Sequence, residues 1–374
     1  MSSMPAPSIS VLEGDPNRRG GEAVEFTGGG RLEVRVTSAD VGKRVSVRYV
    51  TDSPSEGERF TDAVGVLTSW DGDVLTITRK SGETVRIPEP RLVAGKTVPA
   101  APARRRGPAA TFPELSRVAA RAWQPVETEA LGEWTLRAAI QEEPGEARPG
   151  GAVVGRRVGF TRRANSVLPG GDPGLPVAEA LEVVRAWYAD RELPAYVQTA
   201  TGAEGTQELL CAELERLGWS REVTAELRIA ALAPLADREP GTVEVRLSRT
   251  LDEAWLRRYQ RFTAPSPAVR QVLGAGPSVW FASVAGTGEV PAAIGRCVVD
   301  GRWAGFLAIE VDPELRRRGL ATAVMTALAR QALDEGASAA WLQVESDNEP
   351  ARALYEGMGF AVHHHYHHYR QAEA

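Results

Sequence analysis

The sequence predicts an α/β protein in which a small all-β segment precedes two α/β halves. Three observations support this fold class. The stretch from Trp303 to Ala329 reads as a strand, a loop and a helix. A related order of helix, strand and helix occurs earlier, between residues 176 and 219. Ahead of both halves, residues 31–98 carry short alternating runs that are typical of half-buried strands.

The composition is that of an ordinary globular protein with more than one domain. At 374 residues the chain is too long for one average domain. Lys and Arg total 44 against 49 Asp and Glu, a balance that suggests neither nucleic-acid binding nor a polybasic membrane anchor. Cys211 and Cys297 fit no metal or redox spacing, so we expect buried thiols. Without an apolar run of membrane-spanning length or a signal-like N-terminus, we expect a cytoplasmic protein.

The N-terminal third predicts a tail, a small barrel and a linker. Residues 1–30 are rich in Ser, Pro and Gly and predict a disordered tail. Within 31–98, Arg44 to Tyr49 alternates strictly, and Asp71-Gly72 is a strong signal for a two-residue hairpin. Four or five strands in about 70 residues predict a small closed barrel. Residues 99–111, rich in Ala and Pro and carrying three consecutive arginines, predict a linker.

Residues 112–238 predict an α/β domain that repeats the order of the chain's C-terminal half. Its expected strands are Trp134–Ala138, Val153–Thr161 and Ala195–Thr199, and its expected helices begin at Pro176 and span Gln207–Leu217. Aligning Gly218 with Gly359 places Leu214 where the second half has Tyr355. We interpret this domain as a degenerate repeat. An unrelated α/β domain is the alternative.

Residues 242–374 predict the complete module. In the helix that starts at Leu320, apolar residues recur at 3- and 4-residue steps, and Gly336 is a plausible stop. The expected strands are Val243–Leu247, Val279–Val284, Ala292–Val299, Trp303–Val311, Trp341–Val344 and the stretch from Val362, and the other expected helices are Asp252–Phe262 and Pro350–Met358.

The loop before the helix at Leu320 predicts an anion site. A loop that leads into a helix N-terminus presents backbone N–H groups without intrahelical partners, in a field that favours anions. Gly319 and Ala321 have side chains small enough for a phosphate to approach this backbone. The stretch is therefore predicted to hold a pyrophosphate.

Two motifs in this half resemble those of a known superfamily. The segment Val311–Ala321, with Pro313 and the pattern Arg-x-x-Gly-x-Ala from Arg316, resembles the acetyl-CoA pyrophosphate signature of GNAT N-acetyltransferases. The segment Asn348–Phe360 resembles the second cofactor motif of the same superfamily. Both occur in order and in fitting secondary structure, which an ordinary strand–helix turn would not explain.

The resemblance implies a GNAT fold in tandem, with a degenerate first repeat that kept the fold and lost the cofactor site. Residues 31–98 resemble the Src-homology-type barrel that precedes the acetyltransferase module in one family of bacterial GNAT proteins. This barrel would bind a protein partner, or it would be a packing appendage without a ligand, because such folds do not determine function.

The resemblance also implies acetyl-CoA as the co-substrate, with no metal. In the superfamily the strands beside the site splay apart, and the pantetheine arm lies in the gap between them. The implied cofactor-binding residues are Ile309, Val311, Arg316, Arg317, Arg318, Gly319, Leu320, Ala321, Thr322 and Asn348.

Two catalytic roles follow from the same resemblance. Tyr355 matches the tyrosine that protonates the departing thiolate, and a tyrosine with a pKa near 10 is a proton donor at neutral pH. A core aromatic is the alternative. For the base, Gln343 stands where some relatives carry glutamate and cannot serve, so Glu310 is the first candidate. Glu345 and Asp347 follow, and each carboxylate could instead be a solvated rim charge.

All five histidines lie between residues 363 and 368. Strand alternation predicts His363, His365 and His367 on one face, and three imidazoles on one face could bind a metal. We favour a half-exposed terminal strand that borders the acceptor cleft.

Together these features predict an acetyl-CoA-dependent N-acetyltransferase that acts on a primary amine by direct attack on the thioester. The acceptor would be a protein lysine, a protein N-terminus or a small amine. One alternative is a binding protein that senses acyl-CoA without turnover. Another is an amino-sugar acetyltransferase of the mycothiol type. We expect no membrane and no direct nucleic-acid partner.

Overall fold

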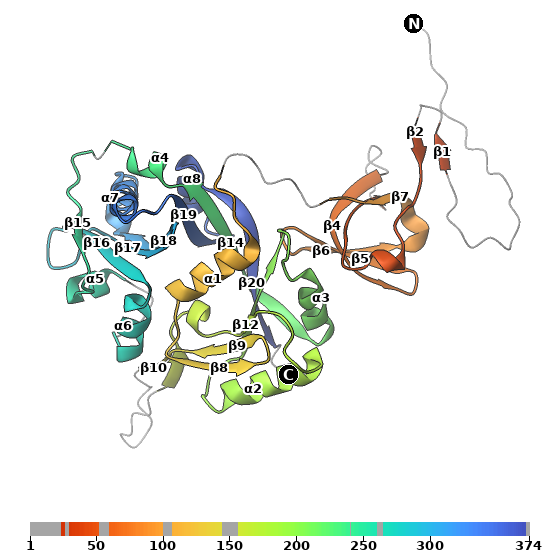
Figure 1. Ribbon diagram of the computed structural model, residues 1–374, viewed down its shortest axis with the longest axis horizontal. Helices are drawn as coiled ribbons and strands as arrows, with labels where there is room; N and C mark the ends of the chain where they lie inside the picture. Colours follow the sequence, from red (N-terminus) through yellow and green to blue (C-terminus); the bar gives the residue numbers. More distant parts are fainter. Residues whose placement is uncertain are drawn as a thin grey trace, which may run out of the picture. The chain divides into compact units, whose positions relative to one another are not determined.

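The computed structural model describes residues 24–26, 30–51, 60–99, 107–143, 156–239, 241–259 and 265–371. The chain divides into two units, Met1–Ala101 and Pro102–Ala374, and most of their elements are labelled in Figure 1. Most of the expected N-terminal tail and the three linker arginines lie outside the described residues. Among the helices that are described, none is long and apolar enough to cross a membrane.

The first unit is all-β, as predicted. Its main sheet is antiparallel with the order β6-β5-β4-β3-β7. The predicted hairpin joins β4 to β5, and Gly72 takes the positive φ of +57° that this turn requires. Alternation buries Val45 and Val47 against the rest of the core. The strands are β1 (Val24–Phe26), β2 (Gly30–Leu32), β3 (Arg44–Val50), β4 (Phe60–Asp71), β5 (Val74–Arg79), β6 (Thr84–Pro88) and β7 (Leu92–Thr97).

The second unit is built on a sheet of eight described strands in the order β13-β20-β14-β19-β18-β17-β16-β15. Its neighbours are antiparallel except for β18 and β19, which are parallel. These strands are β13 (Tyr196–Thr201), β14 (Trp219–Ala231), β15 (Arg246–Ser248), β16 (Ser278–Val284), β17 (Ala293–Asp300), β18 (Trp303–Val311), β19 (Ala339–Glu345) and β20 (Ala361–Gln371). Smaller sheets contain β8 (Glu127–Leu131), β9 (Trp134–Ala138) and β12 (Leu168–Pro169), and β10 (Ile140–Glu143) with β11 (Arg156–Gly159).

The two halves of this unit share the large sheet. Strand β20, at the end of the second half, lies between β13 and β14 of the first half. Strand β14 in turn pairs with β19 of the second half. Because the interleaved strands satisfy one another's backbone groups, neither half can leave without exposing them.

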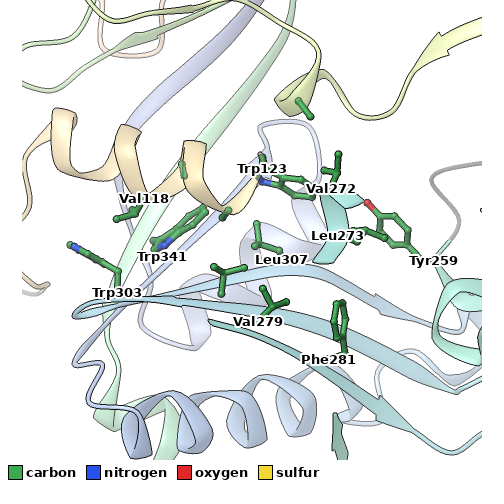
Figure 2. Packing of buried hydrophobic residues seen from close by; sticks show 14 of the residues in the cluster. Val118, Trp123, Tyr259, Val272, Leu273, Val279, Phe281, Trp303, Leu307 and Trp341 are labelled. Carbon is green, nitrogen blue, oxygen red and sulfur yellow. The ribbon is translucent and has the colours of Figure 1, made fainter. Parts of the chain in front are cut away.

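Helices cover both faces of the sheet. One face packs against α4, α7 and α8, around Phe306, Leu328 and Leu342. The other packs against α1, α5 and α6, and Figure 2 shows Val118 and Trp341 of this core. The helices are α1 (Phe112–Ala122), α2 (Val177–Ala189), α3 (Glu208–Arg216), α4 (Ala233–Ala236), α5 (Glu253–Arg258), α6 (Pro267–Gly274), α7 (Leu320–Asp334) and α8 (Glu349–Gly357).

Alternation along β19 explains the two cores. Trp341 points to the α1 face and Leu342 to the α7 face, and each side chain is 1% exposed. The indole of Trp341 needs a glycine on the neighbouring strand, because a Cβ on Gly305 would lie 2.5 Å from the ring.

Most predicted elements occur within a few residues of their expected bounds, but the helices α1, α4 and α6 were missed. Helix α1 begins at a cap in which the Thr111 side chain accepts a hydrogen bond from the Glu114 N–H. Helix α6 begins with the same type of cap at Ser266, followed by Pro267. Both signals are local and could have been read from the sequence. The strand expected at Val243–Leu247 is shorter, at Arg246–Ser248.

We predict that residues 102–374 fold without the N-terminal unit and bind acetyl-CoA within about tenfold of the full chain, because this unit contains its own cores. Residues 242–374 alone should not unfold cooperatively, since β19 and β20 would lose β14 and β13. Urea unfolding and calorimetric titration check both outcomes. A stable, cofactor-binding fragment 242–374 would contradict the shared sheet as a folding unit.

Candidate functional site

The strands β18 and β19 separate at the carboxyl end of their parallel pair. Their register runs from Trp303 opposite Ala339 to Phe306 opposite Leu342, where it stops. Strand β18 nevertheless continues to Val311 alongside β17, and β19 continues alongside β14. A gap therefore opens between two strands, each of which pairs with a described strand only on its other side. Extended ligands can pair with such unmatched backbone groups.

A β-bulge shapes the β18 side of this gap. The register with β17 shifts between Ile294 and Arg296, and Ala308 adopts a φ of +50°. The bulge bends the strand away from its neighbour, as bulges near binding sites often do. Of the predicted cofactor residues, Ile309 lies in the bulge and Val311 lies just beyond it, and both are half-buried.

The loop after β18 turns through two left-handed residues before α7 starts. Arg317 has a φ of +65° and Gly319 a φ of +79°. Gly319 is the N-cap residue, and no described side chain caps this end of the helix. The first N–H groups of α7 are thus left without an intrahelical acceptor, which makes the end of the gap a suitable place for an anion.

Positive charge surrounds the start of α7. Arg316, Arg317 and Arg318 are exposed, and none forms an ion pair with a described carboxylate. The next three predicted residues, Leu320, Ala321 and Thr322, form the first turn of α7 and are half-buried. Just before the loop, the carboxylate of Asp312 forms an ion pair with Arg258 of the same chain. This negative charge is therefore already paired within the protein.

Asn348 lies at the N-terminus of α8 and is exposed. Its Oδ1 accepts a hydrogen bond of 3.2 Å from the Ala351 N–H and so caps the helix. The Oδ1 atom of Asn348 is therefore engaged in capping α8. Its amide NH₂ group is the part that a ligand could use.

Tyr355 lies on α8 in the core formed with α7. The ring is 9% exposed and meets Phe360 edge-on at a centroid distance of 6.1 Å. Burial raises the pKa of the Tyr355 hydroxyl to about 12. The group therefore carries its proton throughout the neutral range, as a general acid must.

The candidate bases differ in their surroundings. Glu310 is half-buried on β18, opposite Ile294 of β17. Glu345 is half-buried at the end of β19, and Asp347 is exposed in the following turn. The Gln343 side chain is hydrogen-bonded within the chain, because its Oε1 accepts a hydrogen bond of 3.1 Å from the indole N–H of Trp123.

The matching gap in the first half is filled by a side chain. Strands β12 and β13 approach through a parallel bridge between Val167 and Val197. Gln207, the N-cap of α3 and so the counterpart of Asn348, spans the space beyond. Its Nε2 donates to the Pro169 carbonyl at 2.7 Å, and its Oε1 accepts from the Ala200 N–H at 3.0 Å. This amide takes backbone groups that an extended ligand would otherwise use.

The loop before α2 is likewise occupied from within. The carboxylate of Glu133 accepts from the Asp172 N–H at 2.7 Å, and the Gly174 N–H donates to the Asp172 carboxylate at 2.8 Å. The Glu133 carboxylate lies close to Gly171, where a Cβ would be 2.0 Å from the Glu133 Oε2. Two carboxylates in the loop would repel a phosphate. These contacts support the interpretation that the first half has lost the cofactor site.

We therefore predict one acetyl-CoA per chain in a calorimetric titration of the full protein. The gap and loop of the first half are occupied by the side chains of Gln207 and Glu133, whereas in the second half the pairing of β18 with β19 stops at Phe306 and Leu342. A stoichiometry of two would show that the first half opens to admit cofactor.

The histidine strand is structural over most of its length. His367 bonds through both ring nitrogens, at 2.9 Å to the Thr201 hydroxyl and 3.0 Å to that of Thr224. The predicted alternation is wrong at His363, because a bulge in the pairing of β14 with β20 places its Nδ1 2.9 Å from that of His364. Among the described residues, no group of His, Cys, Asp and Glu is arranged to hold a metal.

The buried His367 predicts acid sensitivity. Burial lowers the pKa of His367 to about 3, from an ordinary value of 6.5. Between these values the unfolded chain binds more protons, so the free energy of unfolding should fall as pH drops, by up to about 1.4 kcal/mol per pH unit for this group. Urea unfolding between about pH 4 and pH 6.5 should give a shallower slope for His367→Gln. An unchanged slope would show that other groups set the acid sensitivity.

The structure contains a pocket beneath α1 that was not predicted from the sequence. It is small and open to solvent, and it is lined by one face of α1 and by strands of both halves. Among its lining residues are Arg137, Arg163, Gln198 and Gln343. The spacing of these residues along the chain carries no local pattern that could have predicted their meeting.

Comparison with known proteins gives matches over both units. Residues 110–369 match the family described as "Probable histone acetyltransferase Rv0428c C-terminal", and residues 39–96 match "Rv0428c N-terminal Sm-like domain". The chain is 28% identical over 333 residues to the "Probable histone acetyltransferase Rv0428c" of Mycobacterium tuberculosis, which covers 87% of this chain and 93% of that protein. The small all-β domain predicted from the sequence thus corresponds to one described as Sm-like.

Other similarities are shorter or more distant. Over 52 residues the chain is 40% identical to the ribosomal protein bS18-alanine N-acetyltransferase of Escherichia coli strain K12, covering 14% of this chain and 35% of that one. A GCN5-related N-acetyltransferase from Kribbella flavida is 17% identical with a TM-score of 0.46, covering 71% and 98% of the two chains. A tandem GNAT protein from the clavulanic acid biosynthesis pathway is 17% identical with a TM-score of 0.45, covering 72% and 91%.

Proposed function

Because the chain belongs to the acetyltransferase family described as probable histone acetyltransferase Rv0428c, we propose that it transfers the acetyl group of acetyl-CoA to a primary amine. The observation that carries this proposal is the gap between β18 and β19. The gap leads to a helix N-terminus without a side-chain cap among the described residues. One open strand edge and one free helix end are what an extended arm with a pyrophosphate requires.

The donor would be held along this path by the residues that the motifs single out. The backbone of Ile309 and Val311 would pair with the pantetheine amides in place of a neighbouring strand. The N–H groups from Gly319 to Thr322 would bind the pyrophosphate, with Arg316 to Arg318 adding positive charge. The free amide NH₂ of Asn348 would donate to the cofactor.

The reaction needs a neutral amine and a proton for the leaving thiolate. The amine nitrogen attacks the thioester carbonyl, so that the C–N bond forms, the C–S bond breaks and the thiolate leaves. Tyr355 would give its proton to the thiolate, since burial keeps the hydroxyl protonated. Glu310, directly or through water, would take the proton that the amine loses, with Glu345 as the other half-buried candidate.

The names of the relatives suggest protein acceptors. One is described as a probable histone acetyltransferase, and another acts on the alanine of ribosomal protein bS18. A protein lysine and a protein N-terminus are therefore candidate acceptors. A small amine is a third candidate. The Sm-like unit would then serve as a binding module for a protein partner.

Thiol release from acetyl-CoA by the full chain tests the proposal. The acceptor panel would contain a lysine peptide, a peptide with an N-terminal alanine, propylamine and glucosamine. We expect thiol release that depends on at least one amine and rises with pH as that amine loses its proton. Tight acetyl-CoA binding without release on any amine would instead favour the acyl-CoA sensor.

A further inference from the structure

The pocket beneath α1 has a one-sided charge. Its only charged lining residues, among those that the structure describes, are Arg137 and Arg163, and no carboxylate lines it. Its other polar lining residues include Gln198, Gln343, Tyr366 and His364. A concave site with two guanidinium groups and no acidic residue is complementary to an anion.

Arg137 is buried without a counter-charge from any described residue. The side chain is 4% exposed. Its guanidinium donates to the Ser166 carbonyl at 2.8 Å, to the Ser166 hydroxyl at 2.9 Å and to the Gln198 Oε1 at 3.2 Å, all of them uncharged acceptors. Burial lowers the pKa of Arg137 to about 10, so the group remains charged at neutral pH. A buried charge without an ion-pair partner is costly, and a bound anion would offset this cost.

Arg163 adds the second charge from a neighbouring segment. Its Nε donates to the Tyr366 hydroxyl at 2.9 Å, and its guanidinium lies over the Trp123 ring, 5.7 Å from the centroid. No described carboxylate forms an ion pair with Arg163. The negative charge of Glu345 acts without direct contact and favours the charged form of the guanidinium. These contacts fix the guanidinium at the pocket without neutralising it.

The pocket adjoins the proposed reaction site through Gln343. This residue is the first on β19 beyond the last pair with β18, and its side chain lines the pocket. Its hydrogen bond to Trp123 links the strand to α1, which covers the pocket through Phe112 and Ser116 among other residues. A ligand seated at the arginines could therefore extend past Gln343 towards the gap.

We propose that this pocket binds an anionic group, a carboxylate or a phosphate monoester, on the acceptor whose amine is acetylated. This inference rests on the proposed function, and it makes the acceptor a small amine with an anion at its other end. A guanidinium pair binds either anion by the same charge-assisted hydrogen bonds. The amine would enter the gap beside Gln343, where the acetyl group is offered.

Binding without turnover tests the anion site first. Calorimetric titration of the full chain would compare benzoate, phenyl phosphate and benzamide, which is neutral and has the shape of benzoate. We expect the charged probes to bind at least about tenfold tighter than benzamide. Which anion binds more tightly identifies the favoured group. Equal binding of benzoate and benzamide, or no binding of any probe, would overturn the inference.

Two pairs of matched variants locate the effect. Arg163→Gln should bring the affinities for benzoate and benzamide within about twofold of each other, since it removes a pocket charge. The adjacent Arg162→Gln should leave the preference intact, because Arg162 pairs with Glu222 and does not line the pocket. If Arg163→Gln fails to fold, Ser116→Phe on the pocket face of α1 should block the binding of all three probes. The control Arg117→Phe, at the exposed neighbouring position, should leave their binding unchanged. A charge preference that survives the pocket variants would contradict the assignment.

Turnover then separates this inference from the proposed function. β-Alanine and phosphoethanolamine carry an anion, and propylamine does not. We expect kcat/KM for at least one anionic amine to exceed that for propylamine by at least about tenfold, an advantage that Arg163→Gln loses through KM. Equal kcat/KM for all three amines would overturn the inference alone. Charge-selective probe binding without thiol release on any amine would overturn the acetyl-transfer proposal and leave the anion site standing.

Discussion

Replacing Tyr355 with phenylalanine is expected to lower acetyl transfer by about 10²–10⁴-fold, the usual contribution of a general acid, while acetyl-CoA binding is retained. The substitution keeps the ring that packs against Phe360 and removes only the hydroxyl. Burial holds the pKa of this hydroxyl near 12, so the wild-type group is protonated at all neutral pH values. Thiol release measured at saturating acetyl-CoA, together with calorimetric titration of the cofactor, checks the split between turnover and binding.

The control for this variant comes from the first half of the chain. Leu214 occupies the same place in α3 as Tyr355 in α8, and it is fully buried. Leu214→Ala should cost about 2–5 kcal/mol of stability through the cavity it leaves, with turnover per folded molecule unchanged. Undiminished turnover by Tyr355→Phe on its true acceptor would remove the tyrosine from the mechanism.

Replacing Gly319 with proline is expected to weaken acetyl-CoA binding by about 10²-fold or more, because proline removes a backbone donor and cannot adopt a positive φ. Gly319 has a φ of +79° at the start of α7, where no described side chain caps the helix. The loss should therefore come from the geometry of the N–H groups that face the pyrophosphate. Cofactor titration by calorimetry, with circular dichroism to confirm folding, measures it.

The same helix supplies a matched control at its other end. Gly336 has a φ of +89°, and a Cβ at either glycine would meet no atom within 4 Å. Gly336→Pro should thus strain the backbone and cost stability in a similar way, with little effect on acetyl-CoA affinity. If both variants lose affinity equally, the effect is general destabilisation and the loop assignment fails.

The sequence by itself determined the features that depend on neighbouring residues. The strand, loop and helix around Gly319 follow from the apolar period and from a glycine that can take a positive φ. The alternation in β3 and the hairpin follow in the same way, although the two turn residues are Gly72 and Asp73, one position later than expected. Helix α1 could also have been found, since Thr111 and the spacing of its buried residues are local signals.

Only the tertiary structure decided which distant segments meet. The insertion of β20 between β13 and β14 joins residues more than a hundred positions apart, and strand propensity does not specify a partner. The bulge that moves His363 out of alternation arises in that pairing. The plugging of the first gap by Gln207 and the pocket between Arg137, Arg163 and Gln343 likewise depend on side chains brought together by the shared sheet. The residues near each element in the sequence determine that element, whereas the burial of both sheet faces determines how the elements are arranged. The proposed acceptor site depends on that arrangement.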